Sequence, residues 1–450
     1  MHGVQYYVSG NGDDDSNGLS PAKAFRNLQT AADLTKPGDT VFIMDGTFKE
    51  PDGAERVLVI SRSGEKDKPV KYQAYPGHTP VIEFSLWAGI EVQDASHIEI
   101  QGLKVRGRAD AITLEYAQQE MSNLGNPRTS GNGIFVRGDS ASKSVAHNVS
   151  IIDNHVSKAP GGGIGAMHVD YLTIKGNVVE ECGFYAPYAN SGISVYQAVD
   201  IDDYTGYKIV IAGNVSRKNY NHIPFYFSNE DPEKRQFTDG NGIIVDDLKG
   251  SQDFVNPAMS KPFGGRTLIA NNICYDNGGS GIHAFKCLNV DIVHNTAYLN
   301  GRHPEMDVGQ IFANTSEQIT IANNILYALP GKKINDNYKI SEVQFLNNLY
   351  YDGSQSPNSL VQGENTVIEN PAFIALPPAH NAFHPDVSGA CIDNGIRLPL
   401  HDNEHMKLDA SLSPRVVGGA PDIGAFESAL PCQTEHCTSN HSNSIPAKNF

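Results

Sequence analysis

The chain has 450 residues, including 43 glycines and a single tryptophan, and only 19% of its residues are charged. This composition indicates a turn-rich β protein rather than a helical one, and no apolar run is long enough to form a membrane-spanning helix. The formal net charge of −17 argues against nucleic acid or an anionic membrane as a partner, so any acidic polymer would have to meet a local basic patch or a bound cation.

The first 60 residues alternate strand and turn signals around one short amphipathic segment. A Tyr-Tyr-Val-Ser strand at residues 6–9 precedes this segment, and a Pro-Gly-Asp-Thr turn at residues 37–40 follows it. The apolar face of the predicted helix consists of Leu28, Ala31, Ala32 and Leu34. We expect this face to cover the open end of a β-helix. The layout resembles the N-terminal module of many secreted right-handed parallel β-helix proteins.

The opening Met1-His2-Gly3-Val4 lacks the apolar segment of a signal peptide. Either a signal has been trimmed or the protein is cytoplasmic. The resemblance to secreted β-helix proteins implies a secreted or periplasmic location.

From residue 97 onward, a pattern of alternating apolar residues that ends in asparagine recurs. Successive asparagines are 23, 37, 58, 23, 29 and 24 residues apart, so the shortest coil has about 23 residues and longer steps carry insertions. We expect the asparagines at left-handed turn positions, where their side chains can hydrogen-bond from coil to coil as a ladder. They are Asn154, Asn177, Asn214, Asn272, Asn295, Asn324 and Asn348.

These signals predict an all-β fold, a single right-handed parallel β-helix domain over residues 1–428. It comprises a cap module with a short N-terminal capping helix at 1–60, regular coils at 97–353, and a closing segment at 354–428. Residues 420–427 are expected to close the fold in a manner similar to the last strand of many β-helix enzymes. The polar residues 429–450 are predicted to be a disordered tail.

Five of the six cysteines lie in the predicted coils or in the tail. Cys182, Cys274 and Cys287 lie in β-patterned stretches and are expected to pack as small hydrophobes. In the tail, only a disulfide would give Cys432 and Cys437 a structural role.

A second recurring segment begins with Gly-Ile, at residues 133, 163, 192, 242 and 281. Because strand side chains alternate, the Ile and the Val or Ala two residues later point inward in each coil. The remaining residues face outward and form two predicted columns across the coils. The first holds Phe135, Gly165, Ser194, Ile244 and His283, and the second holds Arg137, Met167, Tyr196, Asp246 and Phe285. The position after the strand end is occupied by Gly138, His168, Gln197, Asp247 and Lys286.

Three insertions, at residues 182–190, 219–237 and 248–265, flank these columns and are expected to wall a groove. Their aromatic side chains include Tyr185, Tyr188 and Tyr226. Such rings could stack on sugars, or they could pack on one another to keep the loops ordered.

Asp239, Asp246 and Asp247 form the densest acidic group in the sequence. Together they could bind Ca²⁺, which in turn would hold a uronate carboxylate. A pair of them could instead supply the two carboxyl groups of a glycosidase. A structural alternative is that Asp239 opens a turn and Asp247 pairs with Lys286. Two adjacent aspartates repel each other, which favours a functional role for Asp246 and Asp247.

One coil later, His283 and Lys286 provide candidate bases. A β-elimination needs a base to remove the proton α to a uronate carboxylate, and positive charge to stabilise the enolate. Arg137 and His168 are predicted on the same face two or more coils away, where they suit substrate-binding contacts better than chemistry.

The chain looks like a right-handed β-helix polysaccharide-active protein. The best-known enzymes of this kind are polysaccharide lyases, including calcium-dependent pectate and rhamnogalacturonan lyases. That resemblance implies an acidic Ca²⁺ cluster, here Asp239, Asp246 and Asp247, and a nearby catalytic lysine, here Lys286. The tight Asp-Asp-Gly-x-Asp motif of those lyases is absent, and Lys286 does not lie in their Gly-x-Gly-Phe-Lys context.

β-Helix glycosidases are a second group of similar proteins. Polygalacturonases and lacto-N-biosidase-like enzymes use aspartate pairs on this face, and Asp239 with Asp246 or Asp247 would serve for them. The Gly-His-Gly motif of polygalacturonases is replaced here by Gly281-Ile282-His283.

Three functional hypotheses follow, all with a polysaccharide or oligosaccharide as partner and a monomeric protein expected. The first is a lyase on a uronate-containing glycan, with Lys286 or His283 as base and a cation on the aspartates. The second is a glycoside hydrolase that uses the same aspartates, and the third is a non-catalytic glycan-binding solenoid. The predicted substrate-binding residues are Arg137, His168, Tyr196, Tyr185, Tyr188 and Tyr226.

Overall fold

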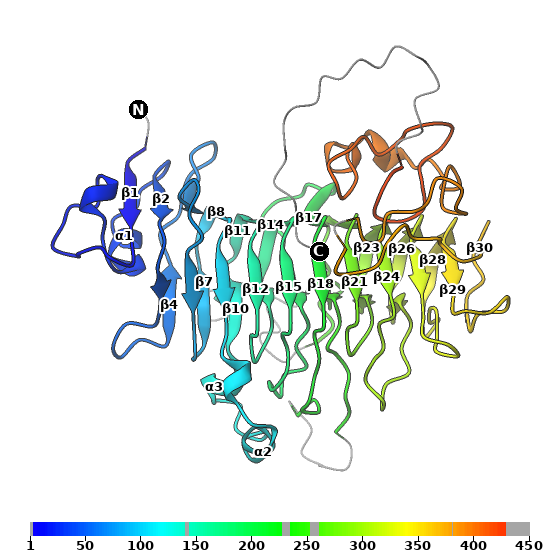
Figure 1. Ribbon diagram of the computed structural model, residues 1–450, viewed down its shortest axis with the longest axis horizontal. Coiled ribbons are helices and arrows are strands. Elements are labelled where there is room, and N and C mark those ends of the chain that lie inside the picture. Colours follow the sequence, from blue (N-terminus) through cyan, green and yellow to red (C-terminus); the bar gives the residue numbers. More distant parts are fainter. Residues whose placement is uncertain (1–2, 140–143, 227–234, 253–260, 380, 429–450) are drawn as a thin grey trace.

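The computed structural model describes residues 3–139, 144–226, 235–252, 261–379 and 381–428. Within these ranges the chain is a right-handed parallel β-helix with three long sheets (Figure 1). Each regular coil passes from sheet A through sheet B to sheet C. The predicted fold class is therefore confirmed.

Sheet A contains β1 (Gln5–Val8), β2 (Thr40–Ile43), β5 (Val70–Ala74), β8 (Ser96–Gln101), β11 (Ala146–Ile152), β14 (Val169–Lys175), β17 (Tyr207–Ala212), β20 (Arg266–Ala270), β23 (Leu288–Val293), β26 (Glu317–Ala322) and β28 (Ser341–Leu346). Sheet B contains β3 (Thr47–Phe48), β6 (Val81–Glu83), β9 (Lys104–Arg106), β12 (His155–Ser157), β15 (Val178–Glu180), β18 (Val215–Arg217), β21 (Ile273–Tyr275), β24 (Thr296–Tyr298), β27 (Ile325–Tyr327), β29 (Leu349–Tyr351) and β30 (Val367–Ile368). Sheet C contains β4 (Arg56–Ile60), β7 (Ala88–Gln93), β10 (Asn132–Arg137), β13 (Ile164–Met167), β16 (Ile193–Tyr196), β19 (Ile243–Asp246), β22 (Ile282–Phe285) and β25 (Ile311–Asn314).

The described helices are short. They are α1 (Leu28–Ala32), α2 (Leu114–Gln119), α3 (Pro127–Ser130) and the single-turn 3-10 segments Pro21–Lys23, Ala109–Ala111, Pro399–Asp402 and Glu404–Met406. No helix in the described ranges has both the length and the apolar character needed to cross a membrane.

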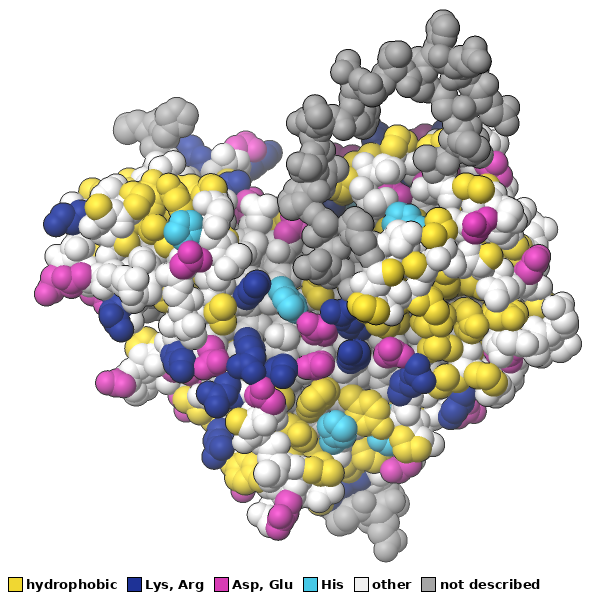
Figure 2. Space-filling model, viewed as in Figure 1, with side chains coloured by type: hydrophobic (Ala, Val, Ile, Leu, Met, Phe, Trp, Pro, Cys, Tyr) yellow, Lys and Arg dark blue, Asp and Glu magenta, His cyan; other side chains and the backbone are white. Residues whose placement is uncertain are grey.

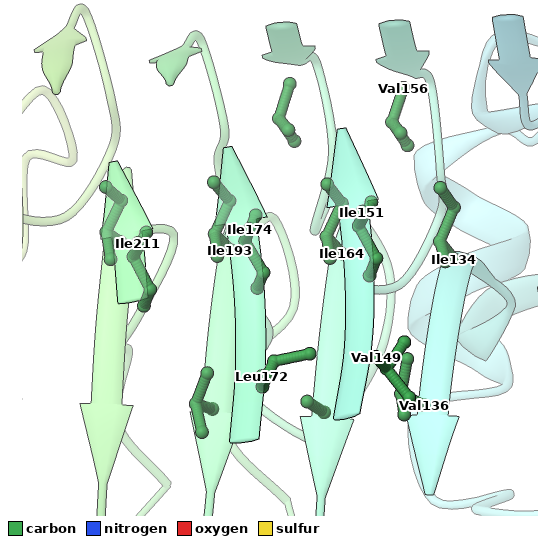
Figure 3. Close-up of a cluster of buried hydrophobic side chains, with 14 of the residues drawn as sticks. Ile134, Val136, Val149, Ile151, Val156, Ile164, Leu172, Ile174, Ile193 and Ile211 are labelled. Atoms are coloured by element: carbon green, nitrogen blue, oxygen red, sulfur yellow. The ribbon is translucent and has the colours of Figure 1, made fainter. Parts of the chain in front are cut away.

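The core is the interior of the coil stack, filled by the inward residues of the three sheets (Figure 3). Ile193 and Val195 of β16 are fully buried, as are their equivalents in neighbouring coils. The glycine before each such isoleucine is required by close packing. A Cβ on Gly163 would lie 2.3 Å from the Val179 side chain and 2.6 Å from the Gly192 carbonyl oxygen. The predicted Gly-Ile pattern thus reflects an interior without room for another carbon.

The predicted asparagine ladder is present where sheet A turns into sheet B. The backbone N–H of Asn177 donates to Asn214 Oδ1 (2.9 Å), and its Nδ2 donates to the same oxygen (3.0 Å). The left-handed residue is not the asparagine itself but the residue before it, such as Gly213 at φ 63° or Asn271 at φ 58°. This differs from the sequence-based prediction, because the ladder asparagine must turn its side chain into the buried stack.

The N-terminal helix caps the stack, but with a smaller face than predicted. Leu28, Ala31 and Ala32 of α1 are buried, whereas Leu34 follows the helix and is 44% exposed. Regular coils also begin well before residue 97, since β2 already pairs with β1 and β5.

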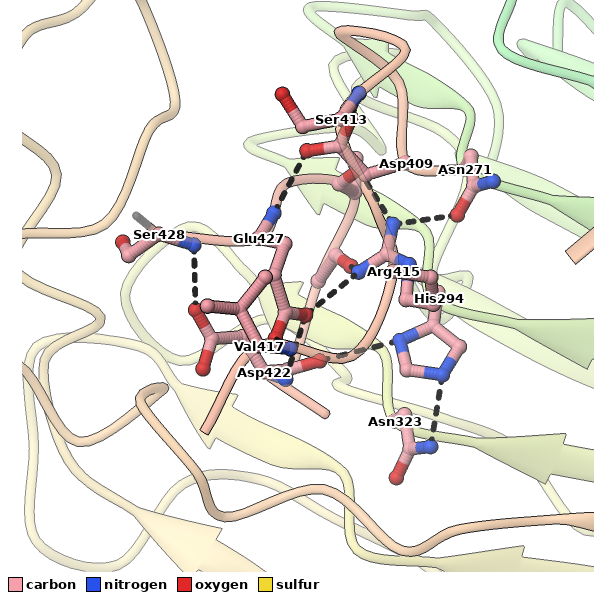
Figure 4. A network of polar contacts seen from close by, with 12 residues as sticks. Asn271, His294, Asn323, Asp409, Ser413, Arg415, Val417, Asp422, Glu427 and Ser428 are labelled. Carbon is pink, nitrogen blue, oxygen red and sulfur yellow. Dashed lines mark hydrogen bonds and ion pairs between the residues drawn. The ribbon is translucent and has the colours of Figure 1, made fainter. Parts of the chain in front are cut away.

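The closing segment folds back along the side of the solenoid (Figure 1). Residues 420–427 form no strand, which corrects the expectation of a last strand. They are held by the buried Arg415, whose Nη2 donates to Asn271 Oδ1 (2.6 Å) and to the Ala425 carbonyl (2.7 Å) (Figure 4). Backbone carbonyl groups of this segment therefore accept hydrogen bonds from the Arg415 side chain instead of from a neighbouring strand.

The cysteines of the coils behave as predicted. Cys182, Cys274 and Cys287 are buried free thiols, and burial raises the pKa of each. The predicted tail, with Cys432 and Cys437, lies outside the described residues.

Candidate functional site

A pocket of about 450 Å³ lies on the outer face of sheet C. Its floor crosses β7, β10, β13, β16 and β19. Its walls come from loops that join sheet B to sheet C and from Gln252, in the loop after β19. The two predicted columns have the predicted register, since Phe135 pairs with Gly165 and Tyr196 pairs with Asp246. Gly165 gives the floor its depth, because a Cβ there would lie 2.8 Å from the Phe135 ring.

Asp246 stands at one end of the pocket, on the last residue of β19. Burial is the largest cause that raises its pKa well above the ordinary value, and the charges of Asp239 and Asp247 add to it. The Lys286 ammonium and a hydrogen bond from Gln252 Nε2 to Asp246 Oδ1 (2.9 Å) act in the opposite direction. Asp246 therefore holds its proton far above the usual pH range of a carboxylic acid.

Asp239 lines the same pocket from the loop before β19. Burial raises its pKa to about 6, while hydrogen bonds from Thr238 (2.9 Å), Ser191 (3.3 Å) and Asn241 (3.1 Å) oppose that rise. The charge of Asp239 is one of the causes that raise the pKa of Asp246, whereas Asp246 does not act on Asp239 in this way, so Asp239 ionises first.

Asp247 does not face the pocket. Its side chain is fully buried and accepts hydrogen bonds from Ser251, Gln252 and Gln197. His168, two coils earlier, is also fully buried and lies 3.4 Å from Gln197 Oε1. The predicted outward position of His168 is wrong, because the residue after the strand end is left-handed (φ 52° for His168) and its side chain turns inward.

The other end of the pocket holds an ion-pair network. Glu91 is 2% exposed and is held between two arginines, with Arg137 Nε donating to Oε1 (2.5 Å) and Arg56 Nε donating to Oε2. Arg56 also pairs with Glu55 (3.6 Å), so two guanidinium groups meet two carboxylates there. Arg137 and Asp246 are three strands apart, or about 14 Å at about 4.8 Å per strand.

Glu91, Arg56 and Trp87 were not predicted as site residues. A signal for Glu91 exists, because Gly89-Ile90-Glu91-Val92 repeats the Gly-Ile pattern and places Glu91 in the Phe135 column. No comparable pattern precedes Arg56.

The loop aromatics divide between the two expected roles. Tyr188 lines the pocket, and its hydroxyl donates to the Leu124 carbonyl (2.6 Å). Tyr185 instead packs on His222, with ring centroids 5.8 Å apart, and the Tyr226 ring lies against Arg235 at 3.7 Å. Tyr185 and Tyr226 are thus absent from the pocket lining, whereas Phe225 contributes to it.

The two candidate bases lie beyond the acidic end of the pocket and do not line it. His283 stacks on Phe312 with centroids 4.3 Å apart, and burial lowers its pKa to about 3. Lys286 extends over the Phe285 ring at 5.0 Å.

The acidic group does not assemble the expected metal ligands. Asp239 and Asp246 face the pocket, but Asp247 is directed inward and its oxygens are taken by other donors. Across the described ranges, no group of three or more His, Cys, Asp or Glu side chains could hold a metal ion. The donor set predicted for Ca²⁺ is therefore not brought together there.

The outer face of sheet B carries charged side chains of both signs. Figure 2 shows Lys, Arg, Asp and Glu side chains interspersed across the face that carries β12, β15 and β18. Ion pairs such as Arg217 with Glu180 (2.7 Å) connect them. Paired charges of this kind leave little net field for an anionic polymer.

Residues 6–324 match the family described as Pel9A-like, right handed beta helix region. The chain belongs to this family. A curated protein, "Uncharacterized protein YwoF" of Bacillus subtilis (strain 168), is 26% identical over 224 residues, which are 49% of this chain and 42% of that protein's length. The chain thus matches less than half of that relative.

Three solved structures match at low sequence identity, and the first of them shows the same fold. Pectate lyase Pel9A is 15% identical with a TM-score of 0.52, and the match covers 95% of this chain and 97% of that one. A rhamnogalacturonan lyase is 17% identical with a TM-score of 0.46, covering 86% and 96%. The GH136 lacto-N-biosidase from Eubacterium ramulus is 13% identical with a TM-score of 0.45, covering 80% and 58%.

Proposed function

We propose that this chain is a glycoside hydrolase that acts on an oligosaccharide or polysaccharide in the sheet C pocket. The observation that carries the proposal is that Asp239 and Asp246 face one pocket with different pKa values. Glycosidases need one carboxylic acid and one carboxylate across the scissile bond, and environments that separate two pKa values assign those roles.

The roles follow from the proton affinities. Asp246, which keeps its proton, donates it to the glycosidic oxygen as the bond from that oxygen to the anomeric carbon breaks. Asp239, which is ionised above about pH 6, either attacks the anomeric carbon or removes a proton from the attacking water. Activity should therefore fall as the pH drops through about 6, because Asp239 becomes protonated.

The rest of the pocket suits a sugar chain. Trp87 and Phe135 supply apolar surface, and Asn132 and Asn190 supply amide groups. At the far end, Arg137 offers a guanidinium to a negatively charged substituent.

A second candidate is β-elimination on a uronate-containing glycan. It is favoured by Lys286, whose ammonium acts on Asp246, and by the arginines at the other end of the pocket. Lys286 would be the base in this reaction, and Arg137 would contact the uronate carboxylate.

One experiment separates the candidates. The protein is incubated with a panel of neutral and uronate-containing oligosaccharides, and new reducing ends and the ultraviolet absorbance of unsaturated uronate are both followed. Hydrolysis predicts reducing ends without the chromophore, lost in both Asp239→Asn and Asp246→Asn. Asn314→Ala, in the same outward column two coils beyond Asp246, serves as the matched control. Unsaturated product lost in Lys286→Ala would replace the hydrolase with a lyase, and binding without any product would indicate a glycan-binding solenoid.

A further inference from the structure

The chain leaves sheet C directly after Asp246 through a turn that the Asp247 side chain holds. Asp247 is left-handed (φ 54°), and its side chain is fully buried. Its Oδ1 accepts from the N–H and the hydroxyl of Ser251, both at 2.7 Å, and its Oδ2 accepts from the Gln252 N–H at 2.8 Å. The Asp247 carbonyl accepts from the Gly250 N–H (3.0 Å). Asp247 thus hydrogen-bonds to the backbone N–H groups of Gly250, Ser251 and Gln252.

This turn sets the position of Gln252. Gln197, in the preceding coil, donates from Nε2 to both Asp247 Oδ2 (2.8 Å) and the Gln252 carbonyl (2.6 Å). Gln252 is therefore held at its N–H and its carbonyl. Its side chain reaches into the pocket, where Nε2 donates to Asp246 Oδ1 (2.9 Å).

The contact distinguishes the two oxygens of the Asp246 carboxyl. A protonated carboxyl group has one carbonyl oxygen and one hydroxyl. An amide N–H needs an acceptor, so Gln252 favours Oδ1 as the carbonyl oxygen and leaves the proton on Oδ2. We propose that Asp247 and Gln252 are positioning residues, which hold the Asp246 carboxyl in one orientation with Oδ2 as its proton-bearing atom. In its consequence for catalysis, this inference rests on the proposed hydrolase function of the pocket.

The charges that face Asp246 make the two positioning residues separable by experiment. Asp239 and Asp247 are its acidic neighbours, Lys286 is its basic neighbour, and Tyr196 lies beside it in register. Gln252→Ala removes a donor to the ionised carboxylate and should raise the pKa of Asp246. Asp247→Asn removes a neighbouring negative charge and should lower it.

The direct test is the titration of Asp246 in the full chain, followed by NMR with ¹³Cγ-labelled aspartate. The Asp246 signal is identified by its absence in Asp246→Asn. The expected result is an upward shift of its pKa in Gln252→Ala, a downward shift in Asp247→Asn and no shift in Asn314→Ala. In parallel, kcat/KM for glycoside hydrolysis should fall by up to about 100-fold in Gln252→Ala and stay unchanged in Asn314→Ala.

An Asp246 pKa that is unmoved, or moves downward, in Gln252→Ala would overturn the inference whether or not the protein hydrolyses any substrate. If the pKa of Asp246 rises in Gln252→Ala and falls in Asp247→Asn but the protein cleaves no glycoside, the positioning role stands and only the proposed hydrolase function is refuted. If Asp247→Asn fails to fold, the pKa of Asp246 in Gln252→Ala decides the question alone. Gln252 is partly exposed, so its side chain can be shortened without opening the core.

Discussion

Replacing Asp239 with asparagine should stabilise the protein while it removes activity. Burial raises the pKa of Asp239 from 3.8 to about 6, a difference of about 2.2 units, or about 3 kcal/mol at about 1.36 kcal/mol per unit. Because Asp239 as a whole residue is partly exposed, we expect the substitution to stabilise the protein by about 2–3 kcal/mol at neutral pH. The amide oxygen of asparagine can still accept from Ser191 and Asn241, so the local structure has no reason to change.

The sign of the effect follows from proton linkage. The folded state binds the Asp239 proton more tightly than the unfolded state, so the contribution of this group is complete below about pH 4 and is lost as the pH rises through about 6. Asparagine does not ionise, so the Asp239→Asn variant does not lose this stability as the pH rises. The unfolding free energy of Asp239→Asn relative to wild type should therefore increase by about 2–3 kcal/mol between about pH 4 and about pH 7, and then level off.

Urea denaturation followed by far-ultraviolet circular dichroism at several pH values measures this difference. Asp402, whose side chain is 80% exposed, provides the control, since Asp402→Asn should change stability by less than about 0.5 kcal/mol throughout. A difference for Asp239→Asn that is independent of pH, or that falls as the pH rises, would refute the assigned environment of Asp239.

Three further predictions concern the floor, the ladder and the metal. Gly165→Val should displace the Phe135 ring and lower kcat/KM at least about tenfold with little change in Tm, and unchanged kinetics would show that substrate does not reach the floor. Asn214→Ala leaves the Ile174 carbonyl and the Asn177 N–H without their partners and should lower the unfolding free energy by about 3 kcal/mol. A loss below about 0.5 kcal/mol would mean that water replaces the ladder. Dialysis against EDTA should leave the hydrolytic rate unchanged, whereas a loss of activity that added Ca²⁺ restores would require a metal site other than Asp239, Asp246 and Asp247.

The repeating part of the fold was accessible from the sequence because the same physical constraint acts in every coil. Glycine recurs where a Cβ would meet the next coil, isoleucine follows where the core must be filled, and these two positions fix the strand register. That register correctly placed Tyr196 beside Asp246. The same repeat at Gly89-Ile90 would have placed Glu91.

The parts that do not repeat were less predictable. Alternation ends where a strand ends, so it could not indicate that His168 and Asp247 turn inward through left-handed backbone. Asn190 lines the pocket where its carbonyl accepts from Gly240 in the loop of the next coil. Phe225 lines it from a long loop in which its N–H donates to the Gln236 carbonyl, and no local pattern encodes either contact. The closing segment is held by the buried Arg415, which donates to backbone carbonyls of the segment. The sequence of this segment has neither the strand nor the helix pattern.

The most direct test of the hydrolase assignment is the dependence of Asp246→Asn on the leaving group. Two substrates with the same sugar are compared, one whose leaving group is an alcohol that must be protonated and one with an activated aryl group that departs as an anion. If Asp246 is the general acid, kcat/KM should fall by about 10²–10⁴-fold for the alcohol and by much less for the activated aryl group. An equal loss for both substrates would contradict the role of Asp246 as the proton donor.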